Sequence, residues 1–261
     1  MRALVTGASG FLGRHLCDLL DQVYPERVEL RSDQSVDRAL RWDPEIVFHL
    51  AAMTDPRACE ADPQLCYEVN VEGTRRLAQG LRCPLVLVST VHVYGPPQRL
   101  PIAEEHPCRP QGVYARSKLD AEGVAPEAIV ARAFNLTGPG QGSAFAPADW
   151  ARQSLGPGPI RTGDLELQRD YLDVRDAARG LVLLASRGAP GTVTNLCRGE
   201  AVSMRWIAEQ LAEGRALVED AERRRPEVPI LVGDNRRARA LGWAPEIPLE
   251  RSLRDLKASL S

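Results

Sequence analysis

The chain has 261 residues, 44% of them hydrophobic, and a formal net charge of −2 at pH 7. A chain of this length can bury a sizeable core, and its nearly balanced charge gives no whole-protein attraction to nucleic acid or to an anionic membrane. We find no run of about 18 apolar residues and no signal-peptide pattern at the N-terminus, so we expect a soluble, cytoplasmic protein.

The first half of the chain alternates apolar runs with helical patterns. Residues 2–6 form a short β-prone run, while 45–50 and 84–89, and more weakly 128–132, are the nearly continuous apolar runs typical of strands buried on both faces of a parallel sheet. Helical patterns cover residues 11–20 and 64–81, and a further helix opens at Tyr114. This alternation predicts an α/β fold with a Rossmann-type, doubly wound parallel sheet.

The segment between Gly13 and His49 is short for the helices and strands that a Rossmann-type sheet requires there. It has to hold a second strand, for which residues 27–31 are the best candidate, and a short helix near 36–42. We therefore expect the second strand to be abbreviated or missing.

The second half is richer in loops. Glycine and proline crowd residues 138–163, which predicts loops around one short helix. Further on, the pattern predicts a strand at 191–196 and helices at 174–186, 203–213, 235–241 and 249–260. We expect a dinucleotide-binding domain formed by residues 1–134, to which 171–196 return, and a small C-terminal substrate-binding lobe formed by 135–170 and 197–261.

The six cysteines lack the paired two-residue spacing that would suggest a zinc site or a redox dithiol, so we expect no metal. Among the 33 basic residues only Lys118 and Lys257 are lysines. Because the chain uses arginine at almost every basic position, we expect its few lysines to have specific roles.

A glycine turn lies directly between the first strand and the first helix. Gly7, Gly10 and Gly13 have the spacing GxxGxxG. Gly7 permits a tight turn, Gly10 lets the backbone approach a pyrophosphate, and Gly13 lets helix and strand pack closely. The free N–H groups of the helix N-terminus add an anion site, so the turn predicts dinucleotide binding.

A tyrosine and a lysine lie four residues apart on one predicted helix. Tyr114 and Lys118 therefore project from the same face and can share one site. A phenol with a pKa of about 10 is a poor acid or base near neutrality, and a nearby ammonium lowers that pKa. Thr90 ends a buried strand at the sheet edge where ligands bind, so its hydroxyl can hydrogen-bond a substrate oxygen.

At these residues the chain resembles the extended short-chain dehydrogenase/reductase superfamily, which comprises sugar-nucleotide epimerases, dehydratases and reductases. The resemblance also covers His49–Ala52, Asn70–Thr74, Val88–Gly95, Phe134–Gln141 and Arg169–Asp176. It implies the catalytic set Thr90, Tyr114 and Lys118. It implies a cofactor site formed by Gly7, Gly10, Phe11, Leu12, Gly13, Arg14, Arg31, Leu50, Ala51, Ala52, Tyr114 and Lys118. It implies that Asn135, Arg169 and Arg225 lie near the substrate diphosphate, and we expect Thr90 and His92 to complete the substrate site.

Within the superfamily, the C-terminal half is most similar to GDP-4-keto-6-deoxymannose reductases, on stretches such as 160–169 and 225–235. The N-terminal half, on stretches such as 51–55 and 59–63, is similar to dTDP-4-dehydrorhamnose reductases. Both resemblances imply a reductase that acts on a 4-keto sugar.

Two departures from the family pattern bear on function. Related dehydratases carry an Asp-Glu pair after the threonine, where this chain has Val91 and His92. Valine cannot transfer a proton, so dehydration is disfavoured. The helix after Lys118 is shortened, and because this helix helps form a dimer in many relatives, a homodimer stays an open alternative.

The cofactor choice depends on the residues that meet the adenosine ribose. Arg14 and Arg31 can receive a 2′-phosphate, which favours NADPH over NADH, whereas Asp33 is the counter-argument.

The sequence therefore predicts NAD(P)H-dependent reduction of a 4-keto-6-deoxy sugar nucleotide. Tyr114 protonates the carbonyl oxygen, Thr90 hydrogen-bonds it, and Lys118 tunes Tyr114. Two alternatives stay open: an NAD-dependent sugar-nucleotide 4-epimerase, and a non-catalytic protein that senses a dinucleotide. The nucleotide itself is left undecided.

Overall fold

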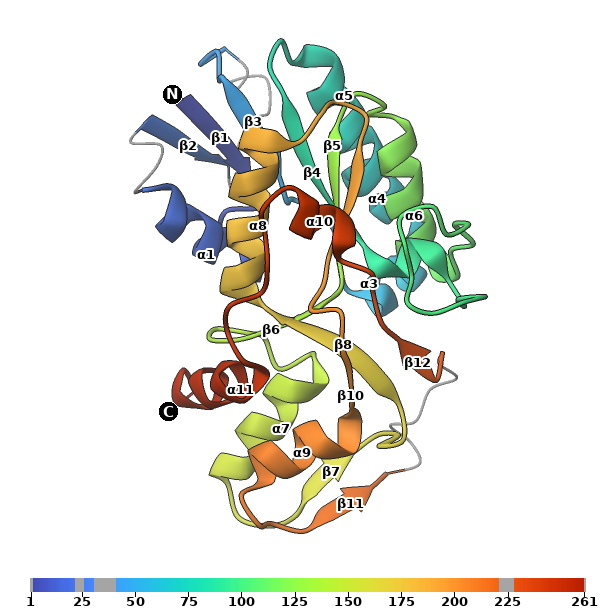
Figure 1. Ribbon diagram of the computed structural model, residues 1–261, viewed down its shortest axis with the longest axis vertical. Helices are drawn as coiled ribbons and strands as arrows, with labels where there is room; N and C mark the ends of the chain where they lie inside the picture. The colour runs from blue at the N-terminus through green and yellow to red at the C-terminus, as the bar shows by residue number, and fades with distance from the viewer. Residues whose placement is uncertain (1, 22–25, 31–40, 221–227, 261) are drawn as a thin grey trace.

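The computed structural model describes residues 2–21, 26–30, 41–220 and 228–260 (Figure 1). Within these residues, one parallel sheet contains six strands in the order β2-β1-β3-β4-β5-β9. Its strands are β1 (Arg2–Thr6), β2 (Glu26–Leu30), β3 (Ile46–His49), β4 (Leu85–Thr90), β5 (Ile129–Ala133) and β9 (Val193–Leu196). The second strand is thus present, so the alternative that it is missing is wrong.

Helices cover both faces of this sheet (Figure 1). On one face α1 (Phe11–Leu20) packs against α8 (Val174–Arg187), and their leucines share a core with Val5 and Phe48. On the other face α5 (Gly73–Gly80) brings Leu77 against Leu4 and Val47. Neighbouring residues of one strand therefore serve different cores, as period-2 alternation requires. The predicted doubly wound α/β fold is confirmed.

The strand order reverses beside β1, because β2 lies on one side of β1 and β3 on the other. Such a reversal opens a crevice at the carboxyl ends of the strands. Thr6 pairs with His49 across β1 and β3, so these carboxyl ends lie level at one edge of the sheet. This edge also contains Thr90, at the end of β4.

The helical run predicted at 64–81 is present but not uniform. It comprises α4 (Pro63–Tyr67), the π-helical turn η1 (Glu68–Glu72) and α5. A short helix that we did not predict, α3 (Pro56–Ala61), precedes the run, and the Asp55 carboxylate caps it by accepting a hydrogen bond from the Arg57 amide at 2.8 Å. The helix α6 (Gly112–Gly123) packs beside β4, and α3, α4 and η1 pack against α6.

The lower part of Figure 1 contains two further small sheets. In one, β8 (Gln168–Asp173) pairs with β6 (Asn135–Thr137), β10 (Ala201–Ser203) and β12 (Ile230–Leu231); in the other, β7 (Ile160–Thr162) pairs with β11 (Leu217–Glu219). The helices of this part are α7 (Ala146–Leu155), α9 (Met204–Ala212) and α11 (Leu249–Ala258), whereas α10 (Arg236–Ala240) packs against β9 of the main sheet. The predicted helices are confirmed, whereas the prediction that residues 138–163 form only loops around one helix is wrong at β7.

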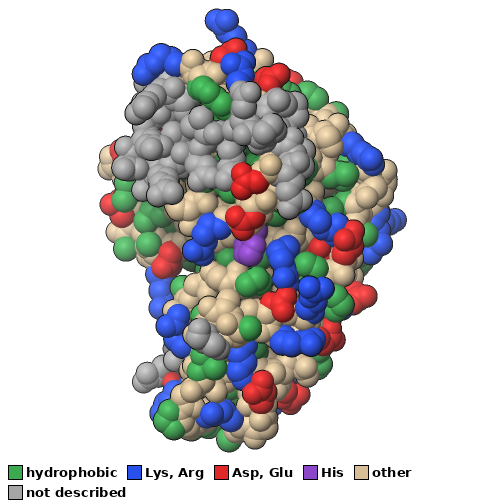
Figure 2. All heavy atoms as spheres, turned by 90° about the vertical axis from the view of Figure 1, so that its left-hand side faces the viewer, with side chains coloured by type: hydrophobic (Ala, Val, Ile, Leu, Met, Phe, Trp, Pro, Cys, Tyr) green, Lys and Arg blue, Asp and Glu red, His purple; other side chains and the backbone are tan. Residues whose placement is uncertain are grey.

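The candidate short helix at 36–42 lies largely outside the described residues, as do Arg31 and Arg225. Within the described ranges, no helix combines the length and the apolar character needed to cross a membrane. On the face shown in Figure 2, basic and acidic side chains are interspersed.

Candidate active site

Two glycines of the turn leave no room for a side chain. Gly7 has φ +72°, and a Cβ atom there would lie 2.7 Å from the Ala51 amide nitrogen. A Cβ atom on Gly13 would overlap the Gly7 carbonyl oxygen. These contacts hold the turn, the start of α1 and the segment after β3 close together.

The N-terminus of α1 is suited to an anionic ligand. Its N-cap is Gly10, which has no side chain that could cap the helix, and the first turn contains no acidic residue. Its free N–H groups are therefore available to a pyrophosphate, which fits the dinucleotide that the glycine spacing predicts. Phe11 and Leu12 are half-buried on the first turn of α1. Leu50, Ala51 and Ala52 are half-buried in the segment after β3, next to Gly7.

Arg14 is exposed on α1 and reaches across to another segment. Its Nη2 donates a hydrogen bond to the Gly140 carbonyl at 3.1 Å, and the neighbouring His15 ring contacts the Pro139 carbonyl at 2.8 Å. The predicted role of Arg14 with a 2′-phosphate stays a prediction, as does that of Arg31.

Thr90 and Tyr114 meet at the edge of the sheet. Thr90 is buried at the end of β4, and Tyr114 is half-buried in the first turn of α6. Burial raises the pKa of Tyr114 to about 12, and hydrogen bonding with the Thr90 side chain opposes this rise. The lowered pKa that we expected for this phenol is therefore wrong for the protein alone, because desolvation of the phenolate outweighs the favourable contacts.

Lys118 lies one turn further along α6, and its side chain is 5% exposed. Burial lowers its pKa to about 8, while the negative charge of Glu122 opposes the change. At neutral pH the amine is therefore still mainly an ammonium, close to the point where it loses its proton.

A buried ion pair anchors the same face of α6 to the sheet. The Glu122 carboxylate accepts two hydrogen bonds from Arg132 on β5, at 3.0 and 2.6 Å, and one from the Ser89 hydroxyl on β4 at 2.5 Å. Both charged side chains are less than 10% exposed. Because Ser89 directly precedes Thr90, this ion pair fixes the position of α6 relative to Thr90.

A chain of buried hydrogen bonds runs behind the glycine turn. The Thr74 hydroxyl donates to the Asn70 carbonyl at 2.7 Å, so it accepts from Nε2–H of His49 at 3.0 Å. Burial lowers the pKa of His49 to about 3, so the ring is neutral and its Nδ1 accepts from the Thr6 hydroxyl at 2.6 Å. The Thr6 oxygen in turn accepts from the Ala51 amide at 3.2 Å, which fixes the backbone beside Gly7.

Asn70 extends this chain to α6. Its side chain bonds both the amide and the carbonyl of Met53, at 2.7 and 3.0 Å, and donates to the Ser117 hydroxyl at 2.9 Å. Ser117 then donates to the Tyr114 carbonyl at 2.8 Å. Asn70 lies in η1, and π-helical turns are frequent at functional sites. We did not predict a role for Asn70; a buried asparagine in an amphipathic helix was the available signal.

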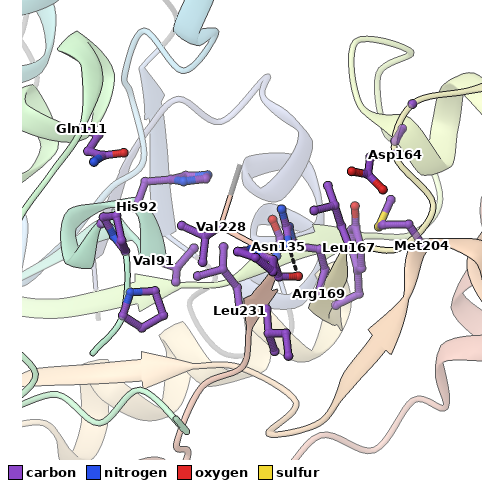
Figure 3. A pocket seen from close by; sticks show the side chains of 18 of the residues that line it. Val91, His92, Gln111, Asn135, Asp164, Leu167, Arg169, Met204, Val228 and Leu231 are labelled. Carbon is purple, nitrogen blue, oxygen red and sulfur yellow. Dashed lines mark hydrogen bonds between the residues drawn. The ribbon is translucent and has the colours of Figure 1, made fainter. Parts of the chain in front are cut away.

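A large cavity of about 1420 Å³ opens from this edge toward the small sheets. Val91 and His92 line its near end, and the His92 and Tyr114 rings lie 6.2 Å apart between centroids. Asn135 and Arg169 lie midway along it (Figure 3). The structure thus brings His92, Asn135 and Arg169 to one cavity, and Tyr114 lies beside His92 at its near end.

Arg169 is held rigidly in the wall of this cavity. Its side chain is largely buried, and its Nη1 donates to the carbonyls of Gln168 and Pro229 at 2.9 and 3.2 Å. The neighbouring Asp170 carboxylate accepts backbone N–H groups, those of Arg198 and Gly199 among them, at 2.8 and 2.9 Å. A guanidinium in this position can bind phosphate oxygens.

Within the described part of the chain, no group of three or more His, Cys, Asp or Glu side chains is placed to hold a metal ion.

The chain is similar to known proteins in sequence and in fold. Residues 3–197 match the model of the NAD dependent epimerase/dehydratase family. The sequence is 34% identical to GDP-6-deoxy-D-mannose reductase from Pseudomonas aeruginosa, with 97% of this chain and 95% of that enzyme covered. It is 29% identical to UDP-glucose 4-epimerase from Mycolicibacterium smegmatis, with 97% and 96% covered. The solved structure of RMD from Pseudomonas aeruginosa complexed with NADPH matches with a TM-score of 0.91 and 32% identity, over 99% of this chain and 98% of that one.

Proposed function

The chain belongs to the NAD dependent epimerase/dehydratase family, and from this premise we propose that it reduces a 4-keto-6-deoxy sugar nucleotide with NADPH or NADH. The observation that carries the proposal is the position of Tyr114 beside His92, with 6.2 Å between the ring centroids, at the near end of the cavity that Asn135 and Arg169 also line. A nucleotide sugar along the cavity would present its keto group to Tyr114. The similarity to a GDP-6-deoxy-D-mannose reductase supports this reaction.

The cofactor fits the turn between β1 and α1. Its pyrophosphate would bind the N–H groups at the start of α1, where Gly7 and Gly10 keep side chains out of the way. A bound reduced nicotinamide supplies the hydride. We favour NADPH, because a similar solved structure is complexed with it.

Three residues of the chain perform the proton chemistry. Tyr114 donates its phenolic proton to the carbonyl oxygen of the substrate, and its high pKa keeps that proton in place at neutral pH until the transfer. The Thr90 hydroxyl orients the same oxygen. The Lys118 ammonium stabilises the phenolate that remains after the transfer.

We assign the substrate diphosphate to the middle of the cavity, where Asn135 and Arg169 line it. His92 lies between this position and Tyr114 and contacts the sugar. Arg225 lies outside the described residues and keeps its predicted role as a second phosphate ligand. We assign residues 1–134 and 171–196 to the cofactor and residues 135–170 and 197–261 to the substrate, in a cytoplasmic enzyme.

The specific observation that favours a second function is the similarity to a UDP-glucose 4-epimerase. An epimerase would use the same residues but return the hydride to the opposite face of the sugar. It would retain NAD through purification, whereas a reductase exchanges its cofactor at every turnover. The absorption spectrum of the purified protein separates the two.

The deciding experiment is a screen of 4-keto-6-deoxy sugar nucleotides for oxidation of NADPH and of NADH. We expect rapid oxidation of one or both cofactors with at least one such substrate. Dinucleotide binding without oxidation by any of them would contradict the proposal and favour the non-catalytic sensing protein.

A further inference from the structure

Side-chain hydrogen bonds hold the backbone on both sides of Tyr114. On the C-terminal side, the Tyr114 carbonyl accepts a hydrogen bond from the Ser117 hydroxyl at 2.8 Å. On the N-terminal side, the Val113 amide donates to Oε1 of Glu60 at 2.7 Å. Glu60 and Val113 lie 53 positions apart in the sequence, so the second bond exists only because the chain folds α3 against α6.

The first turn of α6 has no cap of its own. Its N-cap residue, Gln111, makes no side-chain hydrogen bond to the helix, and the first turn contains no acidic residue. The first amides of a helix have no partner within the helix, so an acceptor from outside stabilises them. The Glu60 carboxylate is such an acceptor, and its negative charge also suits the positive end of the helix dipole.

Gly112, the first residue of α6, leaves room for this contact. Its φ is +80°, in the left-handed region that favours glycine, and a Cβ atom there would lie 3.0 Å from Oε1 of Glu60. A side chain at this position would therefore press on the capping oxygen. Two separate segments thus fit each other at the start of α6.

Glu60 lies in the last turn of α3, and α3 is itself fixed. The Asp55 carboxylate caps its first turn, and the buried Cys59 thiol donates to the Met53 carbonyl at 3.5 Å. Asn70 donates to the same carbonyl at 3.0 Å. The Glu60 carboxylate therefore extends from a helix that is tied to the buried hydrogen bonds behind the glycine turn.

We propose that Glu60 is a positioning residue, whose hydrogen bond to Val113 holds the first turn of α6 so that Tyr114 reaches the substrate carbonyl. Val113 directly precedes Tyr114, so a shift of this amide also moves the bond from Cα to Cβ that directs the phenol. A misplacement of about 1 Å can cost about 10²-fold in rate. The inference rests on the proposed function, because it takes Tyr114 as the proton donor.

Three variants separate the hydrogen bond from the charge and from stability. Glu60→Ala removes the acceptor, whereas Glu60→Gln keeps an acceptor oxygen without the charge. Asp62→Ala is the matched control, because Asp62 accepts the Leu65 amide at 2.9 Å and its loss removes a helix cap of the same kind from α4. Both acidic side chains are exposed, so we expect all three variants to fold.

The first measurement is dinucleotide oxidation in a single turnover of the full-length protein, with GDP-4-keto-6-deoxymannose as the first substrate. A single turnover is used because slow product release would mask the chemical step. We expect Glu60→Ala to lower this rate about tenfold, while the affinities for dinucleotide and nucleotide sugar change less than twofold. Glu60→Gln should restore the rate to within about threefold of the wild type.

Asp62→Ala should lower the thermal stability about as much as Glu60→Ala does and leave the single-turnover rate within about twofold of the wild type. A rate within twofold of the wild type in Glu60→Ala would overturn the inference. So would an equal loss of rate in Asp62→Ala, or a failure of Glu60→Gln to restore the rate.

The second measurement, hydrogen exchange, does not depend on the proposed reaction. In Glu60→Ala the amides at the start of α6 should exchange about tenfold faster than in the wild type, and Glu60→Gln should restore their protection. This pattern in a protein that reduces no keto sugar would support the hold of Glu60 on α6 and overturn the proposed reaction. Unchanged exchange in Glu60→Ala, in a protein that does reduce a keto sugar, would support the reaction and overturn the role of Glu60.

Discussion

The two ends of the cavity are built in different ways. Around Tyr114, each supporting side chain is buried and bonded to the next, from Thr6 through His49 and Asn70 to α6. At the opposite end of the cavity, Asp164 is held by one hydrogen bond in a loop between two short strands. The end of the cavity at Tyr114 is thus preorganised for one proton transfer. At the opposite end, substitutions that alter ligand binding should have little effect on the core.

This contrast predicts that changes near Tyr114 alter turnover and that changes along the cavity alter affinity. Tyr114→Phe should show the largest effect, a loss of about 10²-fold or more in kcat, because only the donated proton is removed. Cofactor binding should be unchanged. Steady-state kinetics measure kcat, and dinucleotide titration measures cofactor affinity. The control is Tyr67→Phe, because Tyr67 lies on α4 with 43% of its surface exposed. A kcat within twofold of the wild type would remove Tyr114 from the reaction.

Arg169→Ala tests the middle of the cavity. Loss of a charge-assisted contact to the diphosphate should weaken nucleotide-sugar binding about ten- to a hundredfold and leave the dinucleotide affinity unchanged. We predict the same for Arg225→Ala. Arg251→Ala, on the exposed side of α11, should change neither affinity. If either variant lost dinucleotide binding and kept nucleotide-sugar binding, the assignment of that arginine to the substrate-binding part of the chain would be contradicted.

The pH dependence of turnover tests Lys118. Because burial lowers its pKa from 10.5 to about 8, the ammonium is present below pH 8 and is lost above it. We therefore expect kcat for reduction to decline above about pH 8, by up to about tenfold per pH unit. Lys118→Arg should be poorly active at all pH values, since a guanidinium cannot replace a compact ammonium there. Normal kinetics in this variant would mean that Lys118 has no part in the reaction, and Lys257→Arg is the control.

The buried His49 predicts a smaller effect, on stability. Its pKa is about 3 in the folded protein and 6.5 in the unfolded chain, so between these values the unfolded chain binds more protons. The free energy of unfolding should therefore fall by about 1.4 kcal/mol per pH unit as the pH drops below about 6.5. Asp170, whose pKa burial raises to about 6, acts in the opposite direction.

The contribution of His49 is consequently read from the difference between the wild type and His49→Gln. Urea unfolding of both proteins at several pH values between 5 and 7 measures it. If the free energy of unfolding depended on pH in the same way in both proteins, His49 would not be held neutral in the folded protein as we describe.

Sequence reasoning predicted the main sheet better than the small sheets. The runs at 84–89 and 128–132 are apolar except for Ser89 and Arg132, because both faces of these strands are covered by helices. By contrast β7, β10 and β11 have three residues each, too few to show a period, and their partners lie far away in the sequence. Short strands of this kind form because the surrounding helices hold them together.

The sequence by itself determined the glycine turn and the pairing of Tyr114 with Lys118. Both depend on spacing within one turn or one helix, which is a local property of the chain. Only the tertiary structure decided how those groups ionise and what surrounds them. The phenol pKa rises instead of falling, because the folded protein removes water from Tyr114. Asn70 joins the site, and Glu60 caps the helix of Tyr114, because segments distant in the sequence pack there.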